Sequence, residues 1–217
     1  MEKKSKRDFG VAASLLLAFA AWTRLLGVVD VRAIGPRGSA VGFATVNGAF
    51  HALTGTNMTL YVITDWLGLV PIGAAFGFAV FGLVQWIRRG KIYRVDKSIL
   101  ALGGFYLIVM GVYVLFEFVV INRRPVLIEG ILEASYPSST TMLVLCVMPT
   151  AMMQLGMRIM HTILRRGVLL ALLIFTGFMV IGRVLSGVHW LSDVVGGVLL
   201  SAGLVTAYRA TVKLLEK

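Results

Sequence analysis

Three ionisable residues lie close together in an otherwise apolar stretch near the end of the chain. Arg183, His189 and Asp193 fall within eleven residues. Because His189 and Asp193 are four residues apart, their side chains leave one face of a helix. A charged group at the centre of a membrane helix costs roughly 2.5–3.5 kcal/mol, so this cluster favours a functional site. An imidazole held by a carboxylate can act as a nucleophile or a base, and a nearby guanidinium can hold a phosphate.

A polar run earlier in the chain has the composition of a helix start. It reads Pro137-Ser138-Ser139-Thr140 and precedes an apolar stretch. Ser138 or Ser139 could cap the following helix, and the free N–H groups of a helix N-terminus suit an anion. A serine here can therefore serve as a cap, as a phosphate ligand, or as both.

The composition places these residues in a membrane protein. The chain has 217 residues, of which 58% are hydrophobic and 14% charged, and its mean hydropathy is +0.88. Such values are typical of a polytopic helical membrane protein. The net charge of +11 comes from short basic clusters between apolar runs, which indicates membrane topology rather than nucleic-acid binding. Cys146 stands alone, and no His/Cys group has metal-ligand spacing, so we expect neither a disulfide nor a metal or other cofactor.

Six apolar stretches approach the roughly 20 residues needed to cross a bilayer. We therefore expect an all-α bundle with about six transmembrane helices. The region 31–64 contains too many polar residues for a span, and we expect an outer loop with a short helix in the membrane interface. The expected spans are 9–29, 66–87, 99–121, 141–157, 168–186 and 191–208.

The basic residues predict the orientation. Fifteen of the 21 Lys and Arg residues fall on one side of these spans, which the positive-inside rule makes the cytoplasmic side, so both termini are expected in the cytoplasm. Arg123, Arg124 and Arg183 fall on the outer side, together with His189. They could bind a phosphate, or Arg123 and Arg124 could anchor the protein to lipid headgroups. The fifteen are Lys3, Lys4, Lys6, Arg7, Arg88, Arg89, Lys91, Arg94, Lys97, Arg158, Arg165, Arg166, Arg209, Lys213 and Lys217.

The pattern resembles the type 2 phosphatidic acid phosphatase family of integral-membrane lipid phosphatases. The third motif of that family is Ser-Arg, five residues, His, three residues, Asp. This chain has Arg183, His189 and Asp193 at the same spacing, with Gly182 in place of the serine. The resemblance covers about residues 99–208 and includes the order of the motifs among the spans.

The first two motifs depart from the family pattern. Arg124-Pro125 of the first motif is present, but Glu117 replaces the lysine seven residues before the arginine, and Glu117 could pair with Arg124. In the second motif, Pro-Ser-Gly-His, the chain keeps Pro137-Ser138. Ser139 replaces the glycine and Thr140 replaces the histidine.

The resemblance assigns a role to each retained residue. It implies that His189 attacks phosphorus to form a phosphohistidine and that Asp193 orients it. The resemblance also implies a phosphate-binding group that includes the third-motif arginine. That group is Arg183, Arg124, Arg123, Ser138, Ser139 and Thr140.

The family's proton donor, the second-motif histidine, is absent. Thr140 can form hydrogen bonds, but a hydroxyl is a poor acid. General acid catalysis contributes typically 10²–10⁴-fold, and an alkoxide needs it more than a phosphate leaving group does. We therefore expect a preference for a pyrophosphate bond, as in a polyprenyl pyrophosphate such as undecaprenyl pyrophosphate, unless Glu129 or Glu133 supplies the proton.

The expected protein is one membrane-embedded, phosphatase-like domain over residues 1–217, in a plasma membrane of bacterial type, with its site facing outside. Its partners are a lipid phosphate and the membrane, with no nucleic acid, and the sequence leaves the oligomeric state open. Two rival hypotheses remain. A pseudoenzyme could only bind phospholipid headgroups, which the loss of the second-motif histidine favours. A transporter could use Arg183 and Asp193 along a pathway, although the polar residues gather at one face.

Overall fold

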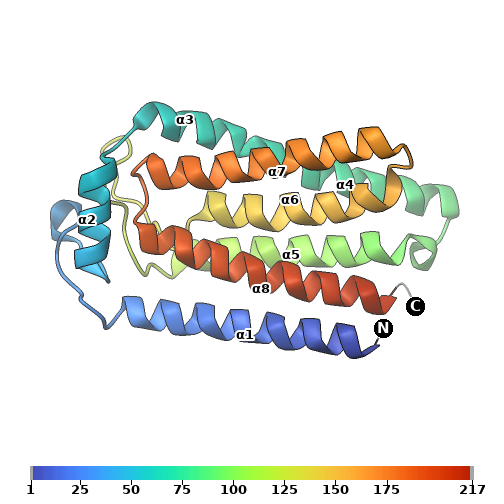
Figure 1. Cartoon of the computed structure of the whole chain (residues 1–217), viewed down its shortest axis with the longest axis horizontal. Coiled ribbons are helices and arrows are strands. Elements are labelled where there is room, and N and C mark those ends of the chain that lie inside the picture. Colours follow the sequence, from blue (N-terminus) through green and yellow to red (C-terminus); the bar gives the residue numbers. More distant parts are fainter. Residues whose placement is uncertain (1, 216–217) are drawn as a thin grey trace.

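Long apolar helices satisfy their own backbone hydrogen bonds, which is what a lipid environment requires. The computed structural model describes residues 2–215, and this part of the chain is helical without a named strand, as expected for an all-α bundle (Figure 1). The helices are α1 (Glu2–Leu26), α2 (Ala44–Thr54), α3 (Met58–Leu67), α4 (Leu69–Arg89), α5 (Lys97–Phe118), α6 (Ser139–Arg158), α7 (Thr162–Leu185) and α8 (Leu191–Leu215), with 3₁₀ turns at Pro36–Gly38 and Ile92–Arg94.

Six stretches within residues 2–215 are long and apolar enough to cross a membrane, so the protein is an integral membrane protein. Five of them match expected spans, and most of their ends lie within a few residues of the expected ends. They are Ser5–Leu26, Met58–Arg89, Lys97–Phe118, Ser139–Arg158, Thr162–Leu185 and Leu191–Leu215.

The second span begins earlier than the sequence indicated. Residues 58–64 belong to α3, which continues into α4 after Gly68, and not to an outer loop. Their polar groups are satisfied inside the protein. The Asn57 side chain accepts a hydrogen bond from the Leu60 N–H, and the buried Thr64 hydroxyl donates to the Leu60 carbonyl. A composition too polar for a lipid-facing helix is therefore tolerated here.

The rest of the region 31–64 contains the expected short helix. α2 runs across one end of the bundle, and the helices on either side run along it (Figure 1). Its position is compatible with a helix in the membrane interface.

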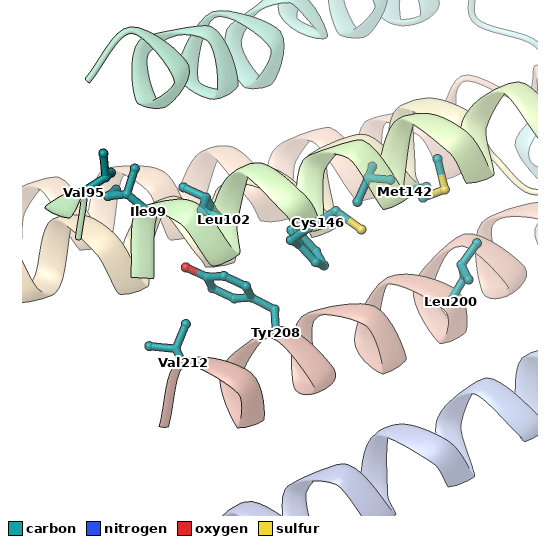
Figure 2. Close-up of a cluster of buried hydrophobic side chains, with 10 residues drawn as sticks. Val95, Ile99, Leu102, Met142, Cys146, Leu200, Tyr208 and Val212 are labelled. Atoms are coloured by element: carbon teal, nitrogen blue, oxygen red, sulfur yellow. The ribbon is translucent and has the colours of Figure 1, made fainter. Parts of the chain in front are cut away.

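Helices α6 and α8 form the centre of the bundle, and small residues on α8 let its neighbours approach closely. A Cβ atom on Gly197 would lie 3.2 Å from the Ser138 carbonyl oxygen at the start of α6. One on Gly203 would lie 2.8 Å from the Leu16 side chain of α1. Figure 2 shows the buried cluster where α5, α6 and α8 meet, with Leu102, Cys146 and Tyr208 among its members.

The bundle has two distinct ends. The start of α1 and the end of α8 lie at one end, and α2 and the segment between α5 and α6 lie at the other (Figure 1). Residues 183–193, where α7 ends and α8 begins, lie at the second end. Of the basic residues that predict the orientation, Lys217 lies outside the described residues.

Candidate active site

His189 is held by the backbone in one ring orientation. It lies in the short segment between α7 and α8, is 4% exposed, and its Nδ1 atom is 3.1 Å from the Ser135 carbonyl oxygen. A carbonyl can only accept, so Nδ1 carries the proton and Nε2 bears the free lone pair. Burial, followed by the positive charges of Arg124 and Arg183, holds the pKa of His189 well below its usual value. The imidazole is therefore neutral at pH 7.

Asp193 positions His189 mainly through a hydrogen bond to the backbone and not by direct contact with the ring. Its Oδ2 atom accepts the Trp190 N–H at 3.0 Å and is 4.0 Å from His189 Nδ1. Asn122 donates to the other oxygen, Oδ1, at 3.0 Å. The carboxylate thus fixes the turn that carries His189, and its charge lies close to the ring.

Two residues outside the motifs secure the start of α8. Asn47 of α2 donates to the Ser192 hydroxyl at 2.8 Å and accepts the Ser192 N–H at 3.1 Å. Trp22 of α1 donates to the Ser192 carbonyl at 3.1 Å. No local sequence pattern indicates these contacts, which join segments about 145 and 170 residues apart.

Arg183 is fully buried and shared between several partners. Its Nη2 donates to Asp65 Oδ1 at 2.9 Å and also to the Thr140 hydroxyl, while Nη1 reaches the Thr64 hydroxyl at 3.4 Å. Its guanidinium carbon lies 5.0 Å from the centre of the Tyr61 ring. Asp65 and Tyr61 come from α3, and sequence reasoning missed both because it placed Tyr61 in a loop and Asp65 just before a span.

Arg124 also lies near the Tyr61 ring, with its guanidinium carbon 5.7 Å from the ring centre. Its Nε is 2.9 Å from Glu133 Oε2, but the pair is not aligned as a hydrogen bond. Glu117 forms no ion pair with Arg124 among the described residues. Arg123 is exposed, and its side chain donates to the Leu132 carbonyl.

The polar run at the start of α6 is divided between the core and the site. Ser138 occupies the N-cap position, but its side chain makes no capping hydrogen bond and instead accepts from Thr141 at 3.0 Å. Its N–H donates to the Asp193 carbonyl at 3.0 Å, which ties α6 to α8. Ser139 and Thr140 line the cavity described next. The expectation that a serine side chain caps α6 was therefore wrong for Ser138.

Most of the candidate residues line a cavity of about 880 Å³ with charged and apolar parts, but Ser138 and Asp193 are not among its lining residues. Glu129 lies outside its lining, exposed in the loop, whereas Glu133 is part of it. The apolar wall comes from α4, α5 and α6 and includes Ile72, Val109, Phe116 and Leu143. The charged residues of the lining are Asp65, Glu117, Arg123, Arg124, Glu133 and Arg183, with His189 beside them.

Several polar atoms at the charged part are buried and free. His189 Nε2, Arg183 Nε, and Arg124 Nε and Nη1 have no hydrogen-bond partner within residues 2–215. Buried polar groups are normally paired, and an unpaired one costs about 1–3 kcal/mol. Two guanidinium groups and one nucleophilic nitrogen around one cavity are what an anion with an electrophilic centre would satisfy.

Comparison with known proteins agrees with this geometry. The family model of the PAP2 superfamily matches residues 117–216. A solved structure of a transmembrane PAP2 type phosphatidylglycerolphosphate phosphatase from Bacillus subtilis is similar to this chain over 92% of this chain and 93% of that one, with 22% identity and a TM-score of 0.51. A search of curated protein sequences found no match. The part of the chain that matches the PAP2 superfamily model contains the three motif segments, and the solved structure has a similar fold.

Proposed function

We propose that this protein is a lipid phosphatase that hydrolyses a phosphate or pyrophosphate group of an amphiphilic lipid through a phosphohistidine at His189. The observation that carries the proposal is the free Nε2 of His189, which is buried beside a cavity lined by Arg183 and Arg124. A neutral imidazole with a fixed tautomer is a competent nucleophile.

The residues then divide the reaction between them. Nε2 of His189 attacks phosphorus, while Arg183 and Arg124 hold the non-bridging oxygens and neutralise their charge. Arg123, Ser139 and Thr140 line the same cavity and can add further contacts to the phosphate, and Ser138 positions the start of α6. The Asp193 carboxylate stabilises the positive charge that develops on the imidazole. Water then hydrolyses the phosphohistidine and releases inorganic phosphate.

The apolar wall of the cavity favours a lipid substrate. A phosphate at the charged part would leave the attached chain against α4, α5 and α6, between helices that face the bilayer. Phosphatidate-like lipids and polyprenyl pyrophosphates both combine such a headgroup with a long chain. The similar Bacillus subtilis protein is named as a phosphatidylglycerolphosphate phosphatase, which supports the same class of substrate.

The test is phosphate release by the purified protein from a panel of lipid phosphates and polyprenyl pyrophosphates in detergent micelles. We expect turnover of at least one member of the panel.

A second candidate function is binding of phospholipid headgroups without turnover, which the threonine at position 140 favours. Saturable binding of the panel lipids with no phosphate release would establish that second function and overturn the first.

We propose that the site faces the outside of the cell. A tag inserted next to Glu129, in the loop at the site end of the bundle, should be accessible to a membrane-impermeant reagent in intact cells. Tags after Lys91 and after Arg165 should become accessible only after the membrane is opened, because most basic residues lie at that end. Labelling of the Lys91 tag, and not the Glu129 tag, in intact cells would reverse the orientation.

A further inference from the structure

Asp65 is a charged residue of the cavity that the family motifs do not include. It lies in α3, outside the matched residues 117–216, and its side chain is 56% exposed at the cavity. Its Oδ1 atom accepts a hydrogen bond from Arg183 Nη2 at 2.9 Å. A half-exposed carboxylate on a phosphate-binding arginine requires an explanation.

The position of Asp65 relative to Thr140 gives one. Both side chains accept hydrogen bonds from the same atom, Nη2 of Arg183. The Asp65 carboxylate is therefore next to the hydroxyl of Thr140, the residue that stands where the family has a histidine. Thr140 itself cannot act as an acid at neutral pH. A carboxyl group beside it can carry the proton that the threonine cannot.

The other carboxyl groups are less well placed. Glu133 pairs with Arg124, with its Oε2 atom 2.9 Å from Nε, and Glu129 is outside the cavity lining. Glu117 lines the cavity from α5 and makes no ion pair among the described residues. Asp65 is the carboxylate that shares the Nη2 donor of Arg183 with the Thr140 hydroxyl.

We propose that Asp65 is the general acid and base of the reaction, in place of the missing histidine; this inference rests on the proposed function. In the empty site, the carboxylate pairs with Arg183. When the substrate phosphate takes over the hydrogen bonds of Arg183, Asp65 loses its cationic partner and faces an anion. The Asp65 carboxyl group, released from Arg183, then faces the bridging oxygen of the substrate and can pass a proton to it.

The proposed reaction has two steps. His189 Nε2 forms a bond to phosphorus as the bond from phosphorus to the lipid oxygen breaks, and Asp65 donates its proton to that oxygen. The products of this step are a lipid alcohol, phosphohistidine and the Asp65 carboxylate. Water then attacks phosphorus, the carboxylate takes one proton from the water, and inorganic phosphate leaves with His189 restored. With an acid in place, simple monoesters become substrates alongside pyrophosphates.

The test compares two leaving groups in the purified protein. One substrate is a lipid phosphomonoester, whose alkoxide leaving group needs a proton. The other is p-nitrophenyl phosphate, whose nitrophenolate is a much weaker base. Asp65→Asn should lower kcat/KM for the lipid monoester by about 10²–10⁴-fold and for p-nitrophenyl phosphate by less than about tenfold. The retained aryl activity would itself show that the variant is folded. Asp8→Asn, which removes an ion pair with Lys213 at the opposite end of the bundle, should change neither value appreciably.

A rescue experiment separates catalysis from structure. Asp65→Asn combined with Thr140→His should regain lipid monoester hydrolysis, because a histidine then supplies the proton from the neighbouring position. Equal losses of activity on the two substrates, without rescue, would show that Asp65 has a structural role. Unchanged monoester hydrolysis in Asp65→Asn would show that Asp65 has no role in the reaction. Either result overturns the proposal for Asp65 but not the proposed lipid phosphatase function. A wild-type protein inactive on every lipid phosphate and on p-nitrophenyl phosphate would overturn both.

Discussion

Replacing His189 by alanine is expected to abolish phosphate release, with a loss of at least about 10³-fold, because the side chain supplies the nucleophile. The variant should fold, since within residues 2–215 the ring makes a single hydrogen bond, from Nδ1 to the Ser135 carbonyl. The measurement is phosphate release from the best lipid substrate, together with acid quenching in the presence of radiolabelled substrate. Acid-labile phosphate should be trapped on the wild-type protein and absent from the variant.

The matched control is His161→Ala. His161 is an exposed histidine at the opposite end of the bundle, where its side chain accepts the Leu164 N–H at the start of α7. Its removal should leave turnover within about twofold of wild type. Full activity in His189→Ala, with a normal gel-filtration profile, would eliminate the phosphohistidine mechanism and not only weaken it.

Replacing Gly187 by alanine should destabilise the site end of the protein strongly. Gly187 has a φ of +65°, and a Cβ atom there would lie 1.9 Å from the carbonyl oxygen of Gly55. The obstacle is backbone, because the connection between α2 and α3 is anchored to this turn by the hydrogen bond from the Asn57 N–H to the Ser186 carbonyl. The left-handed backbone costs about 1–2 kcal/mol for a residue with a side chain, and overpacking costs about 1–3 kcal/mol more.

The readout is the thermal midpoint in detergent and the turnover of the same preparation. We expect a lower Tm and a loss of activity of at least about tenfold, because His189 follows the altered turn by two residues. Gly177→Ala is the control. Gly177 lies on the exposed side of α7 with open space around it, so alanine there should be neutral or slightly stabilising. If Gly187→Ala matches Gly177→Ala in both measurements, the tight contact with Gly55 does not control the site.

Local patterns were sufficient to predict most of the helices, because the apolar stretches are long and do not depend on distant parts of the chain. The expectation that one helix carries both His189 and Asp193 was wrong, because α8 begins at Leu191 and His189 lies in the bend before it. The exception among the helices is α3, whose polar residues obscured the start of the second span. The satisfied hydroxyl of Thr64 and the cap from Asn57 explain why a helix forms there.

The partners of the motif residues could not be read from the sequence in the same way. Asp65 approaches Arg183 across 118 positions, and Asn122 approaches Asp193 across 71. Such pairs have no local periodicity, and the helix packing alone brings them together. The ring orientation of His189 also escaped the sequence, because its Nδ1 partner is a main-chain carbonyl, which any residue at position 135 would offer.

The lengths of α7 and α8 have a consequence for the flow of substrate. From Thr162 to Arg183, α7 rises about 32 Å, and from Asp193 to Leu215, α8 rises about 33 Å, at about 1.5 Å per residue. The hydrocarbon core of a bilayer is about 30 Å thick, so these residues stand one core thickness from the other end of the bundle. The lipid phosphatase that we propose would therefore work on one leaflet only. Its lipid product stays in that leaflet while phosphate enters the water on the same side. Substrate made in the other leaflet must first cross the bilayer, so the rate of lipid flipping, rather than chemistry, would limit its use.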